Sequence, residues 1–136
     1  MKMHAGVRRL LLVLACLIVP PALVAQQGHP LAGVWSGDWG PTGIDRNPVT
    51  IELTWVTTTL GGTINPGLPD AAVIRTGRLD SKNWTVHIEA EGKDENGNPV
   101  RIVVDGKLDA LGSANRTLTG TWTRNNTRST FKLTRE

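Results

Sequence analysis

From residue 31 onward, apolar residues alternate with polar ones in short runs, and this alternation constrains the fold most. Successive side chains of a β-strand point to opposite faces, so the pattern predicts strands with one buried face and one solvated face. Gly, Pro, Asn and Asp interrupt the runs every roughly 8–12 residues, which is typical of an antiparallel all-β domain. The predicted strands lie near residues 31–39, 49–58, 60–65, 71–79, 83–91, 99–108, 116–124 and 128–135.

Nearly every predicted strand has one apolar face, whereas the other face carries Thr and charged residues. The segment AVIRTGRL, in the strand near 71–79, is the exception and shows no clear face. A sheet of about eight such strands can bury its apolar face by closing into an up-and-down barrel, which also leaves no unpaired edge. We therefore predict a single antiparallel barrel, with a two-sheet β-sandwich as the alternative.

The first 25 residues have the order of a secretory signal peptide. A basic start (MKMHAGVRR) precedes an apolar run (LLLVLACLIV) that is shorter than the roughly 20 residues of a membrane helix, and a small-residue exit follows. We expect cleavage after Ala25, a short flexible tail over 26–30 and the barrel domain over 31–136. Lipoprotein processing at Cys16 is the alternative. The chain is thus expected to be secreted or periplasmic and bacterial, meeting the membrane only through its leader.

Removal of the leader changes the charge and the thiol content. The full chain has 15 Lys and Arg against 12 Asp and Glu, but Lys2, Arg8 and Arg9 belong to the leader, so the mature chain is formally neutral. A neutral domain gives no electrostatic reason to expect nucleic-acid or anionic-membrane binding. The one cysteine, Cys16, is also in the leader, so the mature chain has no disulfide, cysteine nucleophile or thiolate metal site.

One pattern, Leu-x-Gly-x-Trp or Ile, occurs three times, as LAGVW at 31–35, LGGTI at 60–64 and LTGTW at 118–122. The Leu and the Trp or Ile face inward with a glycine between them, where the absent side chain lets a strand bend or an indole lie across it. The motif is therefore predicted to be architectural, with a motif that contacts a ligand as the alternative. Because the first and last strands of such a barrel are neighbours, we also expect Trp35 and Trp122 to lie close together.

The Gly33-x-Trp35 start resembles the opening of the calycin barrels, the lipocalins and avidins, and Leu-Thr-Gly-x-Trp is similar to the avidin start. The lipocalin resemblance implies that an arginine from a late strand, Arg128 or Arg135, packs over Trp35. The chain has no tyrosine for an avidin-like biotin site and is too short for the lipocalin C-terminal helix. It looks most like small secreted bacterial proteins with a GxW start and a GTW…LTR ending, so the resemblance does not imply biotin binding.

Two clusters invite a chemical interpretation. The segment Asp94–Asn98 has the oxygen ligands and glycine of a calcium loop but lacks EF-hand spacing, so a hairpin turn is the favoured interpretation. His87, Glu89 and Glu91 share one strand face and could ligate zinc or transfer protons, but that face is predicted to be solvated. The chain has no GxSxG or HExxH motif and no phosphate loop before a helix, so we predict no catalytic residue, metal or cofactor.

The tryptophans are the feature most open to a functional interpretation, because the chain has five of them with one Phe and no Tyr. Indoles inside a barrel either plug it or line a pocket for a small apolar or flat ligand. Strands this short leave little interior space, so plugging is the favoured interpretation. We predict a non-catalytic binding or envelope-associated barrel, whose tryptophans form the walls of the site if it holds a small ligand. A small barrel enzyme of isomerase or cyclase type and a structural envelope protein are the alternatives. The candidate ligand-binding residues are Trp35, Trp39, Trp55, Trp84 and Trp122.

Overall fold

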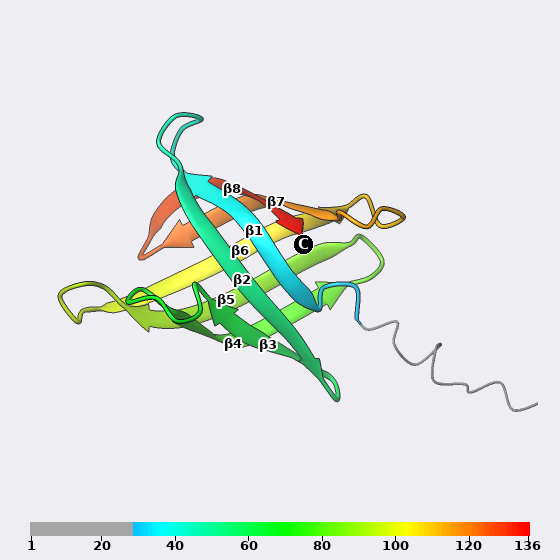
Figure 1. Cartoon of the computed structure of the whole chain (residues 1–136), viewed down its shortest axis with the longest axis horizontal. Coiled ribbons are helices and arrows are strands. Elements are labelled where there is room, and N and C mark those ends of the chain that lie inside the picture. The colour runs from blue at the N-terminus through cyan, green and yellow to red at the C-terminus, as the bar shows by residue number, and fades with distance from the viewer. Residues whose placement is uncertain (1–28) are drawn as a thin grey trace, which may run out of the picture.

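The structure, a computed structural model, describes residues 29–136, which form eight antiparallel strands (Figure 1). Each predicted strand is present, with ends within two residues of the expected ones. The predicted leader, its cleavage site and Cys16 lie outside the described residues. The strands are β1 (Gly33–Gly40), β2 (Asn47–Val56), β3 (Thr59–Ile64), β4 (Ala72–Asp80), β5 (Thr85–Lys93), β6 (Pro99–Asp109), β7 (Thr117–Arg124) and β8 (Thr127–Arg135).

The sheet closes on itself, because β1 pairs with β2 on one side and with β8 on the other. At the seam, Trp39 lies opposite Phe131 and Trp35 lies opposite Arg135. Every other strand pairs with its neighbours in sequence, which is the up-and-down order. The predicted all-β barrel is therefore confirmed, and the two-sheet sandwich is excluded.

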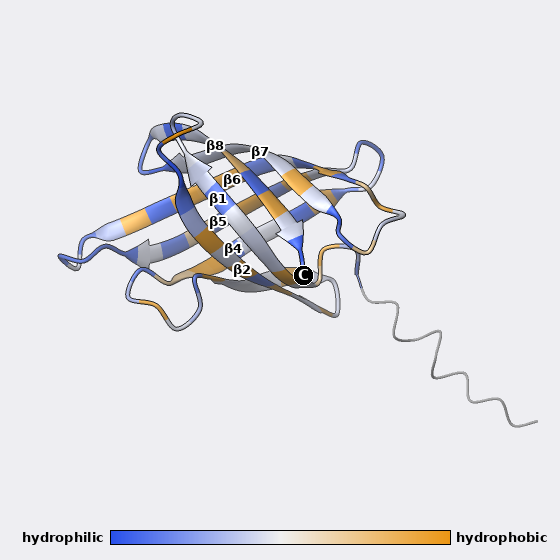
Figure 2. Ribbon diagram, turned by 45° about the horizontal axis from the view of Figure 1, so that its top comes forward, coloured by the Kyte–Doolittle hydropathy of each residue, from blue (hydrophilic) through white to orange (hydrophobic). Residues whose placement is uncertain are grey.

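The barrel interior is apolar, and hydrophobic residues alternate with hydrophilic ones along the ribbons (Figure 2). Trp35 and Trp122 are its largest fully buried side chains, surrounded by Leu, Ile and Val from strands β2 to β8 and by Leu31. Among residues 29–136, Asn65 and Ser129 are the buried polar residues. No ionisable side chain of the described chain is therefore buried in the core.

Strand β4, whose face the sequence did not resolve, contains a β-bulge. Its pairing with β5 shifts between Ile74 and Thr76, which leaves Arg75 as an extra residue. Ile74 is buried before the bulge, whereas Gly77 lies over Leu60 and Leu79 packs on the core after it. A shift of one residue moves every later side chain to the other face, which explains the broken alternation.

The repeated Leu-x-Gly-x-Trp or Ile pattern is architectural, as predicted. Its Leu and Trp or Ile residues are buried in all three copies. The central glycines of all three copies, Gly33 (φ 130°), Gly62 (φ 136°) and Gly120 (φ 157°), have a backbone conformation that side chains disfavour. A Cβ at Gly62 would lie 1.8 Å from the Glu52 carbonyl oxygen, and one at Gly120 would lie 2.1 Å from that of Asp105. At these points the neighbouring strand is too close for any side chain.

Residues 29–32 close one end of the barrel, and we call this end the capped end. Leu31 is fully buried there, and its carbonyl oxygen accepts a hydrogen bond from Trp35 Nε1 at 2.8 Å. Arg116 Nη1 donates to the carbonyl oxygen of Pro30, and Arg135 Nε donates to that of Ala32, both at 2.9 Å. The capped end is thus held by an indole and two guanidinium groups.

Arg135, one of the two arginines that the lipocalin resemblance implies over Trp35, is the register partner of Trp35. Its guanidinium lies directly over Gly33, where a Cβ would come within 2.9 Å of Nε. Arg128 lies at the other end of β8, opposite Thr123. Gly33 therefore leaves the space in which Arg135 reaches the Ala32 carbonyl.

Candidate functional site

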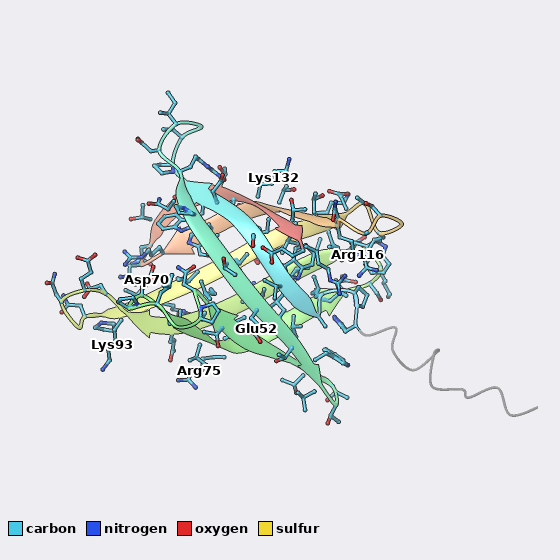
Figure 3. The ribbon with its side chains drawn as sticks, in the orientation of Figure 1. Glu52, Asp70, Arg75, Lys93, Arg116 and Lys132 are labelled. Carbon is cyan, nitrogen blue, oxygen red and sulfur yellow. The ribbon has the colours of Figure 1, made fainter. Side chains whose placement is uncertain are left out.

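The other end of the barrel is where β1, β3, β5 and β7 finish, and we call it the open mouth. The up-and-down order brings the last residues of these four strands together although they are far apart in sequence. Trp39, Lys93 and Arg124 are among them, and Asn65 directly follows β3. Figure 3 shows Asp70 and Lys93 at this end of the barrel and Arg116 at the capped end.

A stacked pair of indoles lies at the open mouth. The rings of Trp39 and Trp122 are 5.7 Å apart at their centroids and inclined by 10°, and Phe131 tilts against Trp122 at 5.9 Å. The expected proximity of Trp35 and Trp122 is wrong, because Trp35 lies four residues earlier on β1 and bonds to the capped end. The residue of β1 that reaches Trp122 is Trp39.

The two remaining candidate tryptophans lie away from the open mouth. Trp55 is 41% exposed and stacks on the His29 ring with centroids 4.0 Å apart. It follows Leu53, the last β2 residue paired with β1, so β3 pairs with it through Leu60 but β1 does not reach it. Trp84 adopts a positive φ of 55° in the turn before β5, where its carbonyl oxygen accepts a hydrogen bond from Leu108 N. The structure therefore does not bring the five indoles together in one pocket.

Side chains fill the barrel almost completely. The hollow inside the open mouth has a volume of about 30 Å³, far below the several hundred Å³ of a typical small-molecule pocket. Outside it lies an open vestibule of about 390 Å³. Both spaces share Trp39, Asp70 and Arg124 as lining residues. The inner cavity is also lined by Ile64, Asn65, Ala72, Gly92, Lys93, Val100, Ile102 and Trp122.

The polar side chains at the open mouth differ in whether they have hydrogen-bond or ion-pair partners among residues 29–136. Asn65 donates from Nδ2 to Asp70 Oδ2 at 3.0 Å and accepts at Oδ1 from Thr50 N at 3.1 Å. Lys93 and Arg124 form no ion pair within residues 29–136. Trp122 Nε1 is the one buried side-chain N or O atom of this region without a hydrogen-bond partner. The inner cavity is therefore lined by two cationic side chains, Lys93 and Arg124, and by Trp122, with Asp70 as its carboxylate.

The Asp94–Asn98 segment, which raised the calcium alternative, is the hairpin turn between β5 and β6. Asp94 Oδ1 accepts the backbone N–H groups of Asn98 at 2.8 Å and Asn96 at 2.9 Å, and these bonds lower the pKa of the carboxyl. This carboxylate therefore shapes the turn. Within the part of the chain that the structure describes, no group of three or more His, Cys, Asp or Glu side chains is placed to hold a metal ion.

His87 and Glu89 lie on the outer wall, as the alternation predicts. His87 Nδ1 is 2.5 Å from Asp105 Oδ1, and Glu89 Oε1 accepts from Arg101 Nη2 at 2.6 Å, a hydrogen bond that lowers the pKa of Glu89. An open groove of about 720 Å³ runs beside His87 and Asp105, across β4 to β7. Among its polar lining residues, His87 and Asp105 are paired with each other. Unlike the open mouth, this groove has no tryptophan or phenylalanine among its lining residues.

Asn65, Asp70, Lys93 and Arg124 are site residues that sequence reasoning missed. A usable signal was present, because Asn65 and Arg124 end alternate predicted strands and Lys93 follows the end of another by two residues, and an up-and-down barrel gathers these strand ends together. Asp70 could not be found this way, since it lies in the loop between β3 and β4.

The chain belongs by its topology to the closed up-and-down β-barrels with a filled interior and an aromatic mouth. Comparison with protein-family models, with curated proteins and with solved structures finds no match for it. The calycin resemblance therefore stays a prediction. No helix within residues 29–136 is long and apolar enough to cross a membrane.

Proposed function

We propose that this protein is a non-catalytic, exported barrel that binds a small flat ligand at its open mouth. The observation that carries the proposal is the Trp39–Trp122 stack at the boundary between the inner cavity and the vestibule. Aromatic faces bind flat apolar groups, and the mouths of barrels are common ligand sites. Of the five candidate tryptophans, Trp39 and Trp122 are therefore the binding residues, and the ligand lies mainly in the vestibule.

Binding fits the structure better than catalysis does. A barrel enzyme of isomerase or cyclase type needs an inward ionisable group with a perturbed pKa. The buried polar residues of the described chain, Asn65 and Ser129, do not titrate. The groups with shifted pKa values, His29, Glu89 and Asp94, lie at the cap, on the outer wall and in the turn that lines the vestibule, so none faces the barrel interior. A structural envelope role, the other alternative, gives no reason for the unpaired indole donor at the mouth.

Export is proposed on the sequence of the first 25 residues, which has the three regions of a signal peptide. The mature domain suits an oxidising compartment, because it contains no cysteine that could be oxidised.

Native mass spectrometry of the protein purified from its own host tests the binding proposal. We expect a small-molecule adduct on the wild-type chain and its loss in Trp39→Leu, which removes the flat surface of the vestibule. Trp55→Leu is the matched control, because it removes an indole at the capped end, and it should retain the adduct. A wild-type chain without an adduct, or an adduct that is lost only in Trp55→Leu, contradicts the proposal.

A further inference from the structure

The chemistry of the ligand can be read from the polar groups of the open mouth, on the basis of the proposed function. Trp122 is 1% exposed and its Nε1 has no hydrogen-bond partner within residues 29–136. Buried donors in folded proteins are almost always paired, and an unpaired one is destabilising. An indole N–H can only donate. The missing partner is therefore an acceptor that lies outside residues 29–136.

The size of the inner cavity limits what this acceptor is. Trp122 lines the cavity of about 30 Å³, which has room for a group of one or two non-hydrogen atoms, about the size of a water molecule. The body of a ligand must then remain in the vestibule of about 390 Å³, against Trp39. A single oxygen atom at the edge of a flat body satisfies both limits.

The charges around the cavity favour an anionic acceptor. Lys93 and Arg124 line it and form no ion pair among the described residues. Its acidic group, Asp70, already accepts a hydrogen bond from Asn65. In the vestibule, Asp94 is bound to backbone N–H groups of its own turn, and Glu95 is the further acidic residue. The inner cavity is thus lined by two cationic side chains and one carboxylate, whereas the vestibule outside it is lined by Asp70, Asp94 and Glu95 against Arg124. The excess of positive charge is confined to the inner cavity.

We infer that the ligand is a planar carboxylate. Its flat body lies on Trp39 in the vestibule, and one carboxylate oxygen enters the inner cavity and accepts the hydrogen bond from Trp122 Nε1. Lys93 and Arg124 balance its negative charge. A charge-assisted hydrogen bond in a water-poor site is stronger than a neutral one, so this contact selects carboxylates over neutral or cationic molecules with the same flat body.

The inference is tested by titrating the ¹⁵N-labelled mature chain with 2-naphthoate and with naphthalene-2-methylammonium, which share a flat body and differ in charge. The indole N–H resonances report each tryptophan separately, and Trp39→Phe and Trp122→Phe assign the two that matter. We expect 2-naphthoate to shift the Trp122 resonance downfield and to bind at least about tenfold more tightly than the ammonium compound.

Variants test the contacts one at a time. Trp122→Phe keeps an aromatic ring but removes the donor, and Arg124→Gln removes a charge at a partly exposed position. Each should weaken 2-naphthoate binding by about tenfold, whereas Trp55→Phe at the capped end should not change it. If Trp122→Phe does not fold, the shift of the Trp122 resonance in the wild type and the affinity of Arg124→Gln for 2-naphthoate still test the carboxylate inference.

The outcomes separate this inference from the proposed function. If 2-naphthoate shifts the Trp39 resonance but not that of Trp122, or if the ammonium compound binds equally well, the carboxylate inference is wrong and binding at the mouth stands. A water molecule alone then satisfies Trp122. If neither compound shifts the Trp39 resonance, the mouth does not bind flat molecules, and the inference and the proposed function both fail.

Discussion

At the scale of single residues, the position of Gly62 shows how closely two strands of this barrel approach. A Cβ there would meet the Glu52 carbonyl oxygen at 1.8 Å, and the backbone φ of 136° disfavours any side chain. Gly62→Ala is therefore expected to lower the free energy of unfolding by about 2–4 kcal/mol, because strain and overpacking add. Urea unfolding measures the change.

Gly112→Ala is the control for Gly62→Ala, since a Cβ at Gly112 would have no atom within 4 Å. It should change the free energy of unfolding by less than about 0.5 kcal/mol. Equal effects of the two substitutions would show that β2 and β3 do not approach each other as described.

His29 makes the stability of the capped end depend on pH. Burial lowers its pKa below 6.5, and its Nδ1 accepts a hydrogen bond from Leu31 N, which only a neutral ring can do. Protonation is therefore easier in the unfolded chain than in the folded one. The contribution of His29 to stability is complete above about pH 6.5 and is lost as the pH falls through its lowered folded-state pKa.

His29→Phe keeps a ring to stack on Trp55 but does not titrate. Urea midpoints measured between about pH 8 and about pH 5 should fall less steeply for this variant than for the wild type. Identical slopes would mean that protonation of His29 is not coupled to folding.

At the scale of elements, the segment of residues 29–32 is a short irregular stretch that is packed like a strand of the core. Leu31 is fully buried, so Leu31→Ala should cost about 2–4 kcal/mol of unfolding free energy. Leu68→Ala, in the loop between β3 and β4, removes the same atoms from a side chain that is 56% exposed and should cost less than about 0.5 kcal/mol. Denaturant unfolding of the pair tests whether the capped end belongs to the core.

The strands could be predicted from the sequence because the alternation of apolar and polar residues within each strand indicates which side chains are buried. Ile51 and Leu53 alternate with Glu52 and Thr54, and this local pattern is enough to place β2 and its inner face. The pattern failed in β4, where Arg75 is an extra residue in the bulge. A bulge is decided by pairing with a neighbouring strand, which a single strand's alternation does not contain.

The site was predicted less well, since alternation gives the face of a residue but not its height along the barrel. Trp35, Trp39 and Trp55 all have inward-facing positions. Trp35 nevertheless bonds to the capped end, Trp39 lies at the open mouth, and Trp55 lies beyond the first residue of β1. Their heights depend on the register of β1 with β2 and β8. For the same reason the pairing of His87 with Asp105 needs the register of β5 with β6.

At the scale of the whole molecule, closure of the barrel depends on the seam between β1 and β8. A Cβ at Gly37 would lie 1.9 Å from the Lys132 carbonyl oxygen across that seam. Gly37→Val should therefore force the seam apart and expose two strand edges, which associate with other chains. Size-exclusion chromatography with light scattering should detect oligomers of this variant.

Gly43→Val is the matched control, because Gly43 lies in the loop between β1 and β2 with no atom near a Cβ position. It should elute with the same mass as the wild type. A Gly37→Val chain that also behaves like the wild type would contradict the tight seam.

The open mouth is a property of the whole barrel, since four strand ends, two indoles and an unpaired donor meet only after closure. A crystal structure of the mature chain grown with 2-naphthoate tests this account most directly. We expect a closed eight-stranded barrel with the naphthalene ring against Trp39 and a carboxylate oxygen within about 3.2 Å of Trp122 Nε1. A ligand bound in the outer groove beside His87 or at the capped end against Trp55 would contradict it.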